Sequence, residues 1–279
     1  MSDRYLPGVP CWVDTNQPDP EAAIKFYRGL FGWELTNQMP SDAPGQYYMA
    51  RLGGGDVAAV SSIPEGAPEQ ATWNTYIWVE DADESIKKAL QAGGTVISEP
   101  FDVMDSGRMA VLADPEGAVF SVWQPDRHRG ASVVNQHGAF VFNTLNVRDL
   151  ERATDFYGAV FGWKPYGTKG SEEFWAQPGY GDLLEDLHPG TRARNAEMGM
   201  PGFEDVVATR NPIAADSEIT PHWSVTFGVD DADKIAERAE QLGGEVVVPP
   251  YDAPWVRQTE IRDPQGAMFT ASKYVPQNQ

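Results

Sequence analysis

The chain has 279 residues, enough for two domains of ordinary size, and 41% of the residues are hydrophobic. Its formal net charge of −20, from 41 acidic and 21 basic residues, disfavours nucleic acid and anionic membranes as partners. The one cysteine, Cys11, excludes an intrachain disulfide and a cysteine-based zinc site. No apolar run approaches transmembrane length and no signal peptide is recognisable, so we expect a cytoplasmic protein.

The first elements in chain order are a strand, a helix and three further strands. Residues 8–16 read as a strand, and residues 19–33 (DPEAAIKFYRGLFGW) predict a helix. Asp19 is placed to cap this helix, Pro20 suits its first position, and Gly32 is placed to end it. The three strands are expected at 33–36, 46–52 and 57–62, separated by turn residues.

The same order of elements returns between residues 72 and 123. A strand is predicted at 72–79 and a helix at 81–92, which Gly93 and Gly94 end. Three strands follow, at 95–99, 107–113 and 118–123. The residues Asp114-Pro-Glu-Gly117 between the last two predict a type I turn.

The second half of the chain repeats the first half, which indicates an internal duplication. Residues 149–163 (DLERATDFYGAVFGW) match 19–33 at an offset of 130, and Trp223 matches Trp73 at an offset of 150. About twenty additional residues therefore lie between these two points, and the Gly- and Pro-containing segment 172–216 is where we expect them. The polar residues 126–137 are expected to link a first domain, 1–125, to a second, 138–279.

Taken together, these motifs resemble the vicinal oxygen chelate superfamily, which includes glyoxalases, extradiol dioxygenases and fosfomycin- and bleomycin-resistance proteins. The resemblance is carried by the FYRGLFGW and FYGAVFGW segments, the Asp-x-Asp helices with Gly-Gly ends, and the two Asp-Pro-x-Gly turns. More narrowly, the chain is similar to two-domain glyoxalase-like or hydroxylase-like proteins of actinobacteria. The resemblance implies an α+β fold: two tandem glyoxalase-like domains, each of two paired βαβββ modules that form a curved sheet around a cavity.

Metal-using members of the superfamily hold a divalent ion in this cavity, so the resemblance also locates the ligand positions. Here those positions carry Trp12, Asn74 and Ser121 in the first domain and Phe142, Ser224 and Thr270 in the second. None of these side chains is a strong ligand for a divalent ion. We therefore predict that neither domain uses a metal or another cofactor.

Alternation along the predicted strands assigns side chains to the cavity face. In the first domain this face carries both aromatic and polar residues: Trp12, Asp14, Asn16, Asn74, Tyr76, Trp78, Ser121 and Trp123. Aromatic walls with a few polar groups suit a planar or apolar ligand, although the same side chains could also fill a core. Asp14 is a candidate general base if it is desolvated among the tryptophans.

The second domain offers a different set of residues, with fewer aromatic rings and more hydroxyl groups. Its cavity face carries Phe142, Thr144, Asn146, Ser224, Thr226 and Thr270. Tyr251 and Trp255, in the loop expected before its third strand, are placed to cover the mouth of the cavity. His222 shares the face of Ser224 and is either an acid/base group or a histidine at a strand edge.

Three functional hypotheses follow. The first is a metal-independent protein that binds an aromatic or apolar small molecule for sequestration, resistance or sensing. The second is a metal-free tailoring enzyme, such as an isomerase, a cyclase or a hydroxylase-like protein, acting on a natural-product or dicarbonyl substrate. The third, a metal-dependent lyase or dioxygenase, is disfavoured by the residues at the ligand positions. The expected partner is a small molecule, and the chain is expected to be a monomer or a homodimer.

Overall fold

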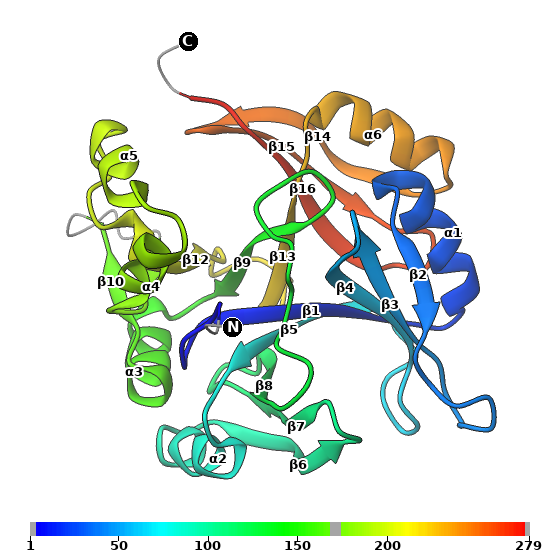
Figure 1. Ribbon diagram of the computed structural model, residues 1–279, viewed down its shortest axis with the longest axis horizontal. Helices are drawn as coiled ribbons and strands as arrows, with labels where there is room; N and C mark the ends of the chain where they lie inside the picture. Colours follow the sequence, from blue (N-terminus) through cyan, green and yellow to red (C-terminus); the bar gives the residue numbers. More distant parts are fainter. Residues whose placement is uncertain (1–3, 168–173, 277–279) are drawn as a thin grey trace. The chain divides into compact units, whose positions relative to one another are not determined.

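The structure is a computed structural model that describes residues 4–167 and 174–276 (Figure 1). The first half of the chain forms a mixed eight-stranded sheet with the order β2-β3-β4-β1-β5-β8-β7-β6. Its strands are β1 (Pro10–Gln17), β2 (Glu34–Asn37), β3 (Tyr47–Leu52), β4 (Gly55–Ser62), β5 (Thr72–Trp78), β6 (Thr95–Val103), β7 (Gly107–Ala113) and β8 (Val119–Pro125). β1 pairs with β4 in parallel, as β5 does with β8.

The second half forms another eight-stranded sheet, in the equivalent order β10-β11-β12-β9-β13-β16-β15-β14. Its strands are β9 (Phe140–Val147), β10 (Lys164–Tyr166), β11 (Phe174–Ala176), β12 (Val206–Pro212), β13 (His222–Gly228), β14 (Glu245–Ala253), β15 (Val256–Arg262) and β16 (Met268–Tyr274). Here β9 pairs with β12 in parallel, as β13 does with β16. The duplication predicted from the sequence is thus present in the strand order of both sheets.

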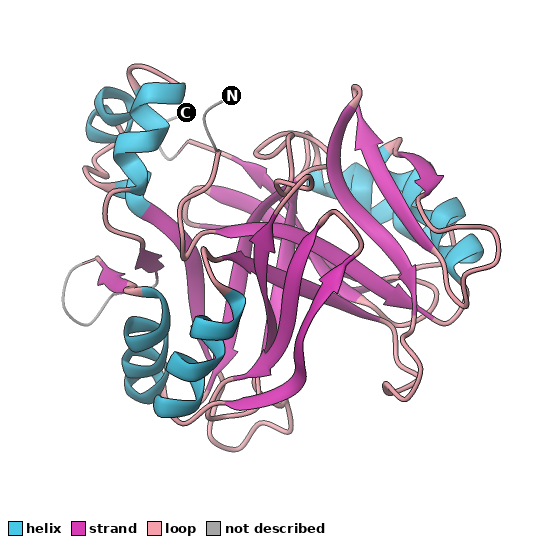
Figure 2. Ribbon diagram, turned by 60° about the horizontal axis from the view of Figure 1, so that its bottom comes forward, coloured by secondary structure: helices cyan, strands magenta, loops and turns pink. Residues whose placement is uncertain are grey.

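Four of the six α-helices in the described residues lie where the sequence predicts helices, and the other two, within residues 172–216, were not predicted. The six helices are α1 (Pro20–Phe31), α2 (Ala82–Gln91), α3 (Leu150–Phe161), α4 (Tyr180–Leu187), α5 (Thr191–Glu197) and α6 (Ala232–Gln241), drawn in cyan in Figure 2, with a short 3₁₀ turn at Phe203–Asp205. Asp19 caps α1 by accepting a hydrogen bond from the Ala22 amide at 3.1 Å. Gly32 ends α1 with a φ of 72°, a left-handed conformation that favours glycine.

Two differences from the predicted elements have a local physical cause. The additional residues expected in 172–216 form, within the described part of that segment, the helices α4 and α5. β6 does not stop at residue 99 but continues to Val103, through Pro100. Pro100 is tolerated because β6 is the outermost strand of its sheet, where a missing backbone donor is least costly.

Contacts between residues divide the chain into two compact units, and this division differs from the division into sheets. Unit 1 comprises Met1–Cys11, Thr75–Gly130 and Asn143–Trp223. Within it α2 packs against α3, and Phe120 of β8 contacts Phe156 and Tyr157 of α3. The Trp163 indole adds a buried hydrogen bond of 2.7 Å to the backbone oxygen of Gly8.

Unit 2 comprises Trp12–Asn74, Ala131–Phe142 and Ser224–Gln279. Within it α1 packs against α6, and a Cβ atom at Gly29 would lie 2.8 Å from the Leu242 side chain. The core of this unit is an aromatic cluster in which Phe227 lies 5.1 Å from Phe31 and 5.0 Å from Trp73, measured between ring centroids. Helices from the two halves of the chain therefore share one core.

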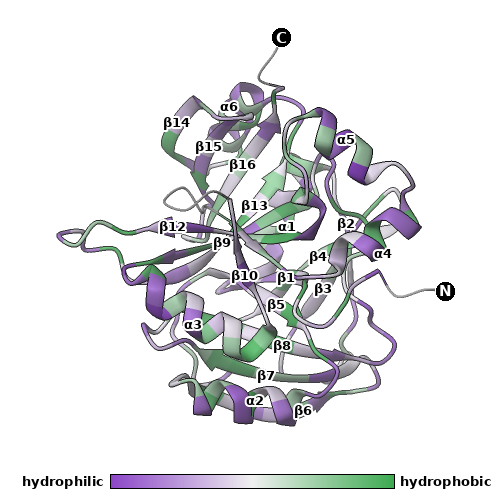
Figure 3. Cartoon of the chain, turned by 90° about the vertical axis from the view of Figure 1, so that its left-hand side faces the viewer, coloured by the Kyte–Doolittle hydropathy of each residue, from purple (hydrophilic) through white to green (hydrophobic). Residues whose placement is uncertain are grey.

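Hydrophobic and hydrophilic residues alternate along α2 in Figure 3, as expected of a helix with one buried face. The buried positions are Ala82, Ser85, Ile86 and Ala89, which recur at helical spacing. None of the helices in residues 4–167 and 174–276 is both long enough and apolar enough to cross a membrane.

Candidate functional site

A hydrogen-bonded group of four side chains lies on β1, β3 and β5 within unit 2. We call Trp12, Asp14, Tyr47 and Asn74 the Asp14 cluster. The Trp12 indole donates to the Tyr47 hydroxyl at 3.0 Å, and that hydroxyl donates to Oδ2 of Asp14 at 3.2 Å. The Asn74 amide donates to Oδ1 of Asp14 at 2.8 Å. Three elements of one unit thus converge on a single carboxylate.

The members of the cluster differ in their access to solvent. Asp14 and Trp12 are each 2% exposed, whereas Tyr47 and Asn74 are half-buried. Burial, and then the negative charge of Asp14, hold the pKa of the Tyr47 hydroxyl well above its ordinary value. Tyr47 is therefore a neutral phenol at physiological pH and acts through hydrogen bonds.

Neighbouring residues of β1 alternate between two environments, as strand geometry requires. Asn16 follows Asp14 on the same face, and its Oδ1 accepts a hydrogen bond from the Ser61 hydroxyl at 2.8 Å. Thr15, on the opposite face, donates to the backbone oxygen of Thr72 at 3.0 Å. Thr15 and its neighbour Gln17 are fully buried.

The other residues predicted for the first cavity, Tyr76, Trp78, Ser121 and Trp123, belong to unit 1 and are buried there. Tyr76 and Trp123 pack edge to face with centroids 6.4 Å apart. The Trp123 indole donates to the backbone oxygen of His128 at 2.9 Å, and Trp78 contacts Tyr5. These aromatic rings have partners typical of a packed interior.

Within unit 1, the candidates from the second domain form a polar row at β9, β12 and β13. Thr144 shares a hydrogen bond with Thr209. Asn146 accepts from the Asn211 amide at 2.9 Å and lies 3.3 Å from Nε2 of His222. His222 is exposed, and its Nδ1 lies 2.8 Å from the backbone oxygen of Thr220. An exposed histidine at a strand end accords with the structural alternative for this residue.

The remaining second-domain candidates lie in unit 2. Four of them are half-buried strand residues: Phe142, Ser224, Thr226 and Thr270. The expectation that Tyr251 lies in a loop is wrong, because β14 continues through it to Ala253 and its hydroxyl accepts from Gln258 at 2.6 Å. Trp255 does lie in the turn after β14, with a φ of 68°.

The residues around Asp14 do not form a set of donors that suits a divalent ion. Asp14 is the one carboxylate of the cluster, and its neighbours Trp12 and Asn74 point N–H groups rather than lone pairs at their partners. Across the described ranges 4–167 and 174–276, no three His, Cys, Asp or Glu side chains are grouped to hold an ion. The absence of a metal in the working protein stays a prediction.

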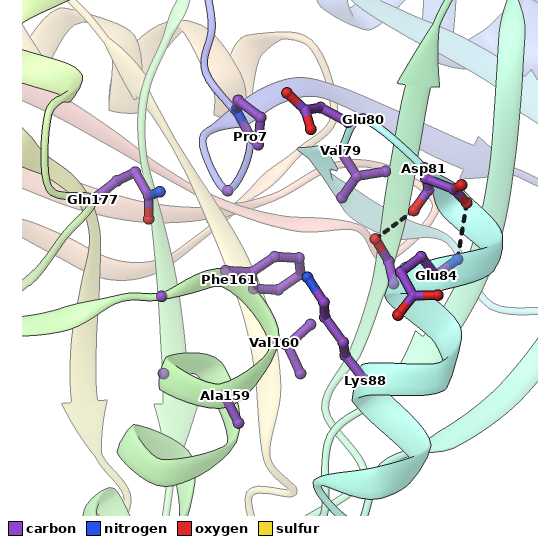
Figure 4. A pocket seen from close by; sticks show the side chains of 14 residues that line it. Pro7, Val79, Glu80, Asp81, Glu84, Lys88, Ala159, Val160, Phe161 and Gln177 are labelled. Atoms are coloured by element: carbon purple, nitrogen blue, oxygen red, sulfur yellow. Dashed lines mark hydrogen bonds between the residues drawn. The ribbon is translucent and has the colours of Figure 1, made fainter.

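A separate hollow of about 440 Å³ lies in unit 1, at the start of α2 and the end of α3 (Figure 4). Its wall includes the apolar Val160 and Phe161 and the charged Glu80, Asp81 and Lys88. The Asp81 carboxylate is occupied there in capping α2, since it accepts from the Glu84 amide at 2.9 Å. None of the predicted site residues lines this hollow.

Tyr47 is the member of the Asp14 cluster that the sequence reasoning missed. The strand that carries it was predicted at 46–52 and is observed as β3. Alternation within that strand puts Tyr47, Met49 and Arg51 on one face, so a tyrosine beside the inward face of β1 could have been proposed. The pairing of β3 with β4, and of β4 with β1, brings it near Asp14.

Comparisons with known proteins agree with this architecture. Residues 12–123 match a glyoxalase-like domain, and residues 138–270 match the glyoxalase/bleomycin resistance protein/dioxygenase superfamily. The chain is 39% identical over 283 residues to CFP32 of Mycobacterium bovis, whose name marks it as a candidate glyoxylase, and the match covers 98% of both chains. The chain belongs to this superfamily, which is the vicinal oxygen chelate superfamily inferred from the sequence.

A second relative is DauV of Streptomyces sp. strain C5, named as an anthracycline biosynthesis protein. It is 34% identical over 280 residues, which cover 96% of this chain and 94% of DauV. Among solved structures, the Mn(II)-bound glyoxalase of Novosphingobium aromaticivorans has a TM-score of 0.59 at 15% identity, covering 96% of this chain and 83% of that one. The 2,3-dioxygenase LapB of Pseudomonas sp. KL28 has a TM-score of 0.57 at 13% identity, covering 96% and 93%. At such identities the two structures show the fold alone, and they confirm it.

Proposed function

We propose that this chain is a metal-independent member of its superfamily that binds an aromatic or apolar small molecule. The observation that best supports the proposal is the Asp14 cluster, where an indole and an amide occupy two of the family ligand positions and, with the Tyr47 phenol, form a hydrogen-bonded group around one carboxylate. Aromatic surface supplies the apolar contact that such a ligand needs, and a few oriented polar groups supply specificity.

The names of two relatives narrow the expected chemical class of the ligand. DauV and DnrV carry names that place them in anthracycline biosynthesis, and anthracyclines are planar polycyclic aromatic compounds. A ligand of this shape would contact the ring of the half-buried Tyr47 while its polar substituents reach Tyr47 and Asn74. Sequestration, resistance and sensing each require such binding without turnover.

A metal-free tailoring enzyme is the second candidate, and the hydrogen bond between Tyr47 and Asp14 is the observation that favours it. The Asp14 carboxylate can take up the proton of the Tyr47 hydroxyl while the Tyr47 oxygen takes a proton from the bound molecule, so that one proton leaves the molecule and one reaches Asp14. The natural-product or dicarbonyl substrates of such an enzyme would be isomerised, cyclised or prepared for hydroxylation.

Titration with doxorubicin by isothermal calorimetry tests the binding proposal. We expect saturable binding, and Trp12→Phe should weaken it. Trp175→Phe serves as the comparison, because Trp175 is a buried tryptophan of β11 in unit 1 and is not one of the predicted site residues. Mass spectrometry after incubation separates the two candidates: an unchanged compound supports binding alone, and a new product supports the enzyme. The absence of binding to planar polycyclic compounds would remove the binding proposal.

A further inference from the structure

Each hydrogen bond of the Asp14 cluster has a fixed donor and a fixed acceptor, because the number of hydrogen atoms on each group is known. We call this arrangement of donors and acceptors the polarity of the cluster. An indole N–H can only donate, so Trp12 donates to the Tyr47 oxygen at 3.0 Å. A phenol carries one hydrogen, and Tyr47 directs it to Oδ2 of Asp14 at 3.2 Å. Toward a ligand, the Tyr47 oxygen therefore offers only its remaining lone pair.

The orientation of Asn74 is fixed by the same rule. An ionised carboxylate has no hydrogen to give, so the Nδ2 group of Asn74 must be the end that faces Oδ1 of Asp14, at 2.8 Å. The other end of the amide is a carbonyl oxygen, which also only accepts. Tyr47 and Asn74, the two half-buried members of the cluster, thus both present acceptors.

Tyr47 keeps its hydrogen as pH rises, and Asn16, two residues from Asp14 on the same face, has the opposite polarity. The pKa of Tyr47 is held high by burial and by Asp14, so the phenol keeps its hydrogen in the alkaline range. Asn16 uses its carbonyl oxygen to accept from Ser61, which leaves its N–H groups as donors. Asn16 lies two residues from Asp14, roughly 6.6 Å along the strand, so the donor and the acceptors are separate contact points.

We propose that the Asp14 cluster selects ligands that present a hydroxyl group, such as phenols, and discriminates against the corresponding ethers and against molecules that carry only carbonyl oxygens. An ether or carbonyl oxygen has no hydrogen to donate, so a half-buried acceptor that faces one is left without a hydrogen bond. The lost hydrogen bond lowers the affinity for such ligands. The inference rests on the proposed small-molecule function and names the ligand class of that site. A dicarbonyl compound in its diketo form has acceptors alone, so the same count favours phenols over the dicarbonyl substrates considered for the second candidate.

A matched pair of probes tests this polarity: 2-hydroxyanthraquinone and 2-methoxyanthraquinone. The affinity of the chain for each probe is measured by calorimetry at mildly acidic pH, where the hydroxyl group of 2-hydroxyanthraquinone carries its hydrogen. We expect the wild-type chain to bind the hydroxyl compound tighter by about tenfold or more, because one hydrogen bond to a part-buried acceptor is gained.

Asp14→Asn provides the sharpest variant, because it reverses the polarity without removing a side chain. The new amide donates to Tyr47, whose own hydrogen then turns toward the ligand, so the preference should disappear or change in favour of the methoxy compound. Tyr47→Phe removes one of the two acceptors and should reduce the preference. Thermal unfolding and near-ultraviolet circular dichroism establish that each variant is folded.

The outcomes separate the inference from the function on which it rests. Equal affinity of the wild-type chain for the two probes would overturn the inference and leave aromatic binding standing. A preference that survives unchanged in a folded Asp14→Asn variant would assign the selectivity to other residues and also overturn it. Binding of neither probe would remove the proposed aromatic site together with its selectivity.

Discussion

The Tyr27 hydroxyl donates to Oδ2 of Asp263 at 2.8 Å, although 236 residues separate them in the sequence. The Trp73 indole donates to the same hydroxyl at 3.1 Å, and Gln17 donates to the same carboxylate oxygen at 2.7 Å. All four side chains are buried within unit 2. This contact ties α1, from the start of the chain, to the turn between β15 and β16.

Unit 1 contains the matching network with different partners. The Tyr157 hydroxyl of α3 donates to Asp114 at 3.1 Å, and the Trp223 indole donates to Tyr157 at 2.9 Å. Asp114 and Asp263 are the first residues of the two Asp-Pro-x-Gly turns. Each turn therefore anchors a helix from the other half of the chain, and each carboxylate is fully engaged away from solvent.

Replacing Tyr27 by Phe should destabilise the protein by about 1–3 kcal/mol, because it leaves the Trp73 N–H and one acceptor site of Asp263 unpaired in the interior. Urea unfolding followed by circular dichroism measures the change. Tyr157→Phe should have a similar effect through unit 1. Tyr274→Phe is the control, since Tyr274 is 52% exposed, and a shift under about 0.5 kcal/mol is expected there. A Tyr27 variant as stable as this control would contradict the account.

The pKa of the Asp114 carboxyl is raised, chiefly by desolvation, and this gives the unfolding free energy a defined pH dependence. The stability contributed by its protonated form is complete below the unfolded pKa of about 3.9 and is lost as pH rises through the folded pKa. Asp114→Asn lacks this titration. The variant should therefore gain stability relative to wild type as pH is raised from about 3.5 to 6.

Urea titrations of both proteins at several pH values measure that difference, and effects of the other carboxylates cancel in it. The prediction is wrong if the difference in unfolding free energy between the two proteins stays constant over this interval, or if it changes in favour of the wild type as pH rises.

Cys11 should be unreactive in the native protein and reactive once the chain unfolds. It is fully buried in β1, and burial raises the pKa of its thiol far above the ordinary range, so the thiolate is scarce at neutral pH. We expect iodoacetamide at about pH 8 to leave the native chain unmodified, as measured by mass spectrometry. The same reagent in urea should add one group per chain, because there is one cysteine. Rapid native labelling would contradict the burial of this strand.

Removal of metal ions should leave the stability and the ligand affinity of the protein unchanged, because none of the residues at the family ligand positions is a strong metal ligand. Dialysis against EDTA is expected to leave both the melting temperature and the affinity for doxorubicin unchanged. Elemental analysis of protein purified without chelator provides the direct measurement. One equivalent of zinc or manganese per chain would refute metal independence and would direct attention to side chains other than Trp12, Asn74 and Ser121.

The parts of the fold that could be predicted are those marked by signals between residues close in the sequence. Asp19 and Gly32 mark the ends of α1 because a cap side chain and a left-handed glycine are signals within a few residues. α4 and α5 were not predicted, and both begin at glycines, Gly179 and Gly190, without a side-chain cap. The packing of α1 on α6 depends on contacts between residues more than two hundred positions apart, which no short pattern records.

The candidate site was predictable in part for the same reason. Trp12, Asp14 and Asn74 were found from alternation on strands whose partners could be guessed from the family resemblance. Tyr47 was missed because its approach to Asp14 depends on the register of β3 against β4 and of β4 against β1. The prediction that Tyr251 lies in a loop failed because the outermost strand β14 continues through two consecutive prolines, at 249 and 250, which an edge strand accommodates.

Unit 2 combines an early segment of the chain with a late one, so it cannot fold completely until Ser224–Gln279 has been synthesised. Its first segment, Trp12–Asn74, is translated early, yet α6 and β13–β16, with which it shares a core, are translated last. Unit 1, by contrast, has all its segments once Trp223 has emerged. While the middle of the chain is synthesised, α1 can pack on β4 but has no contact with α6, so the core of unit 2 is completed only when the last segment is synthesised.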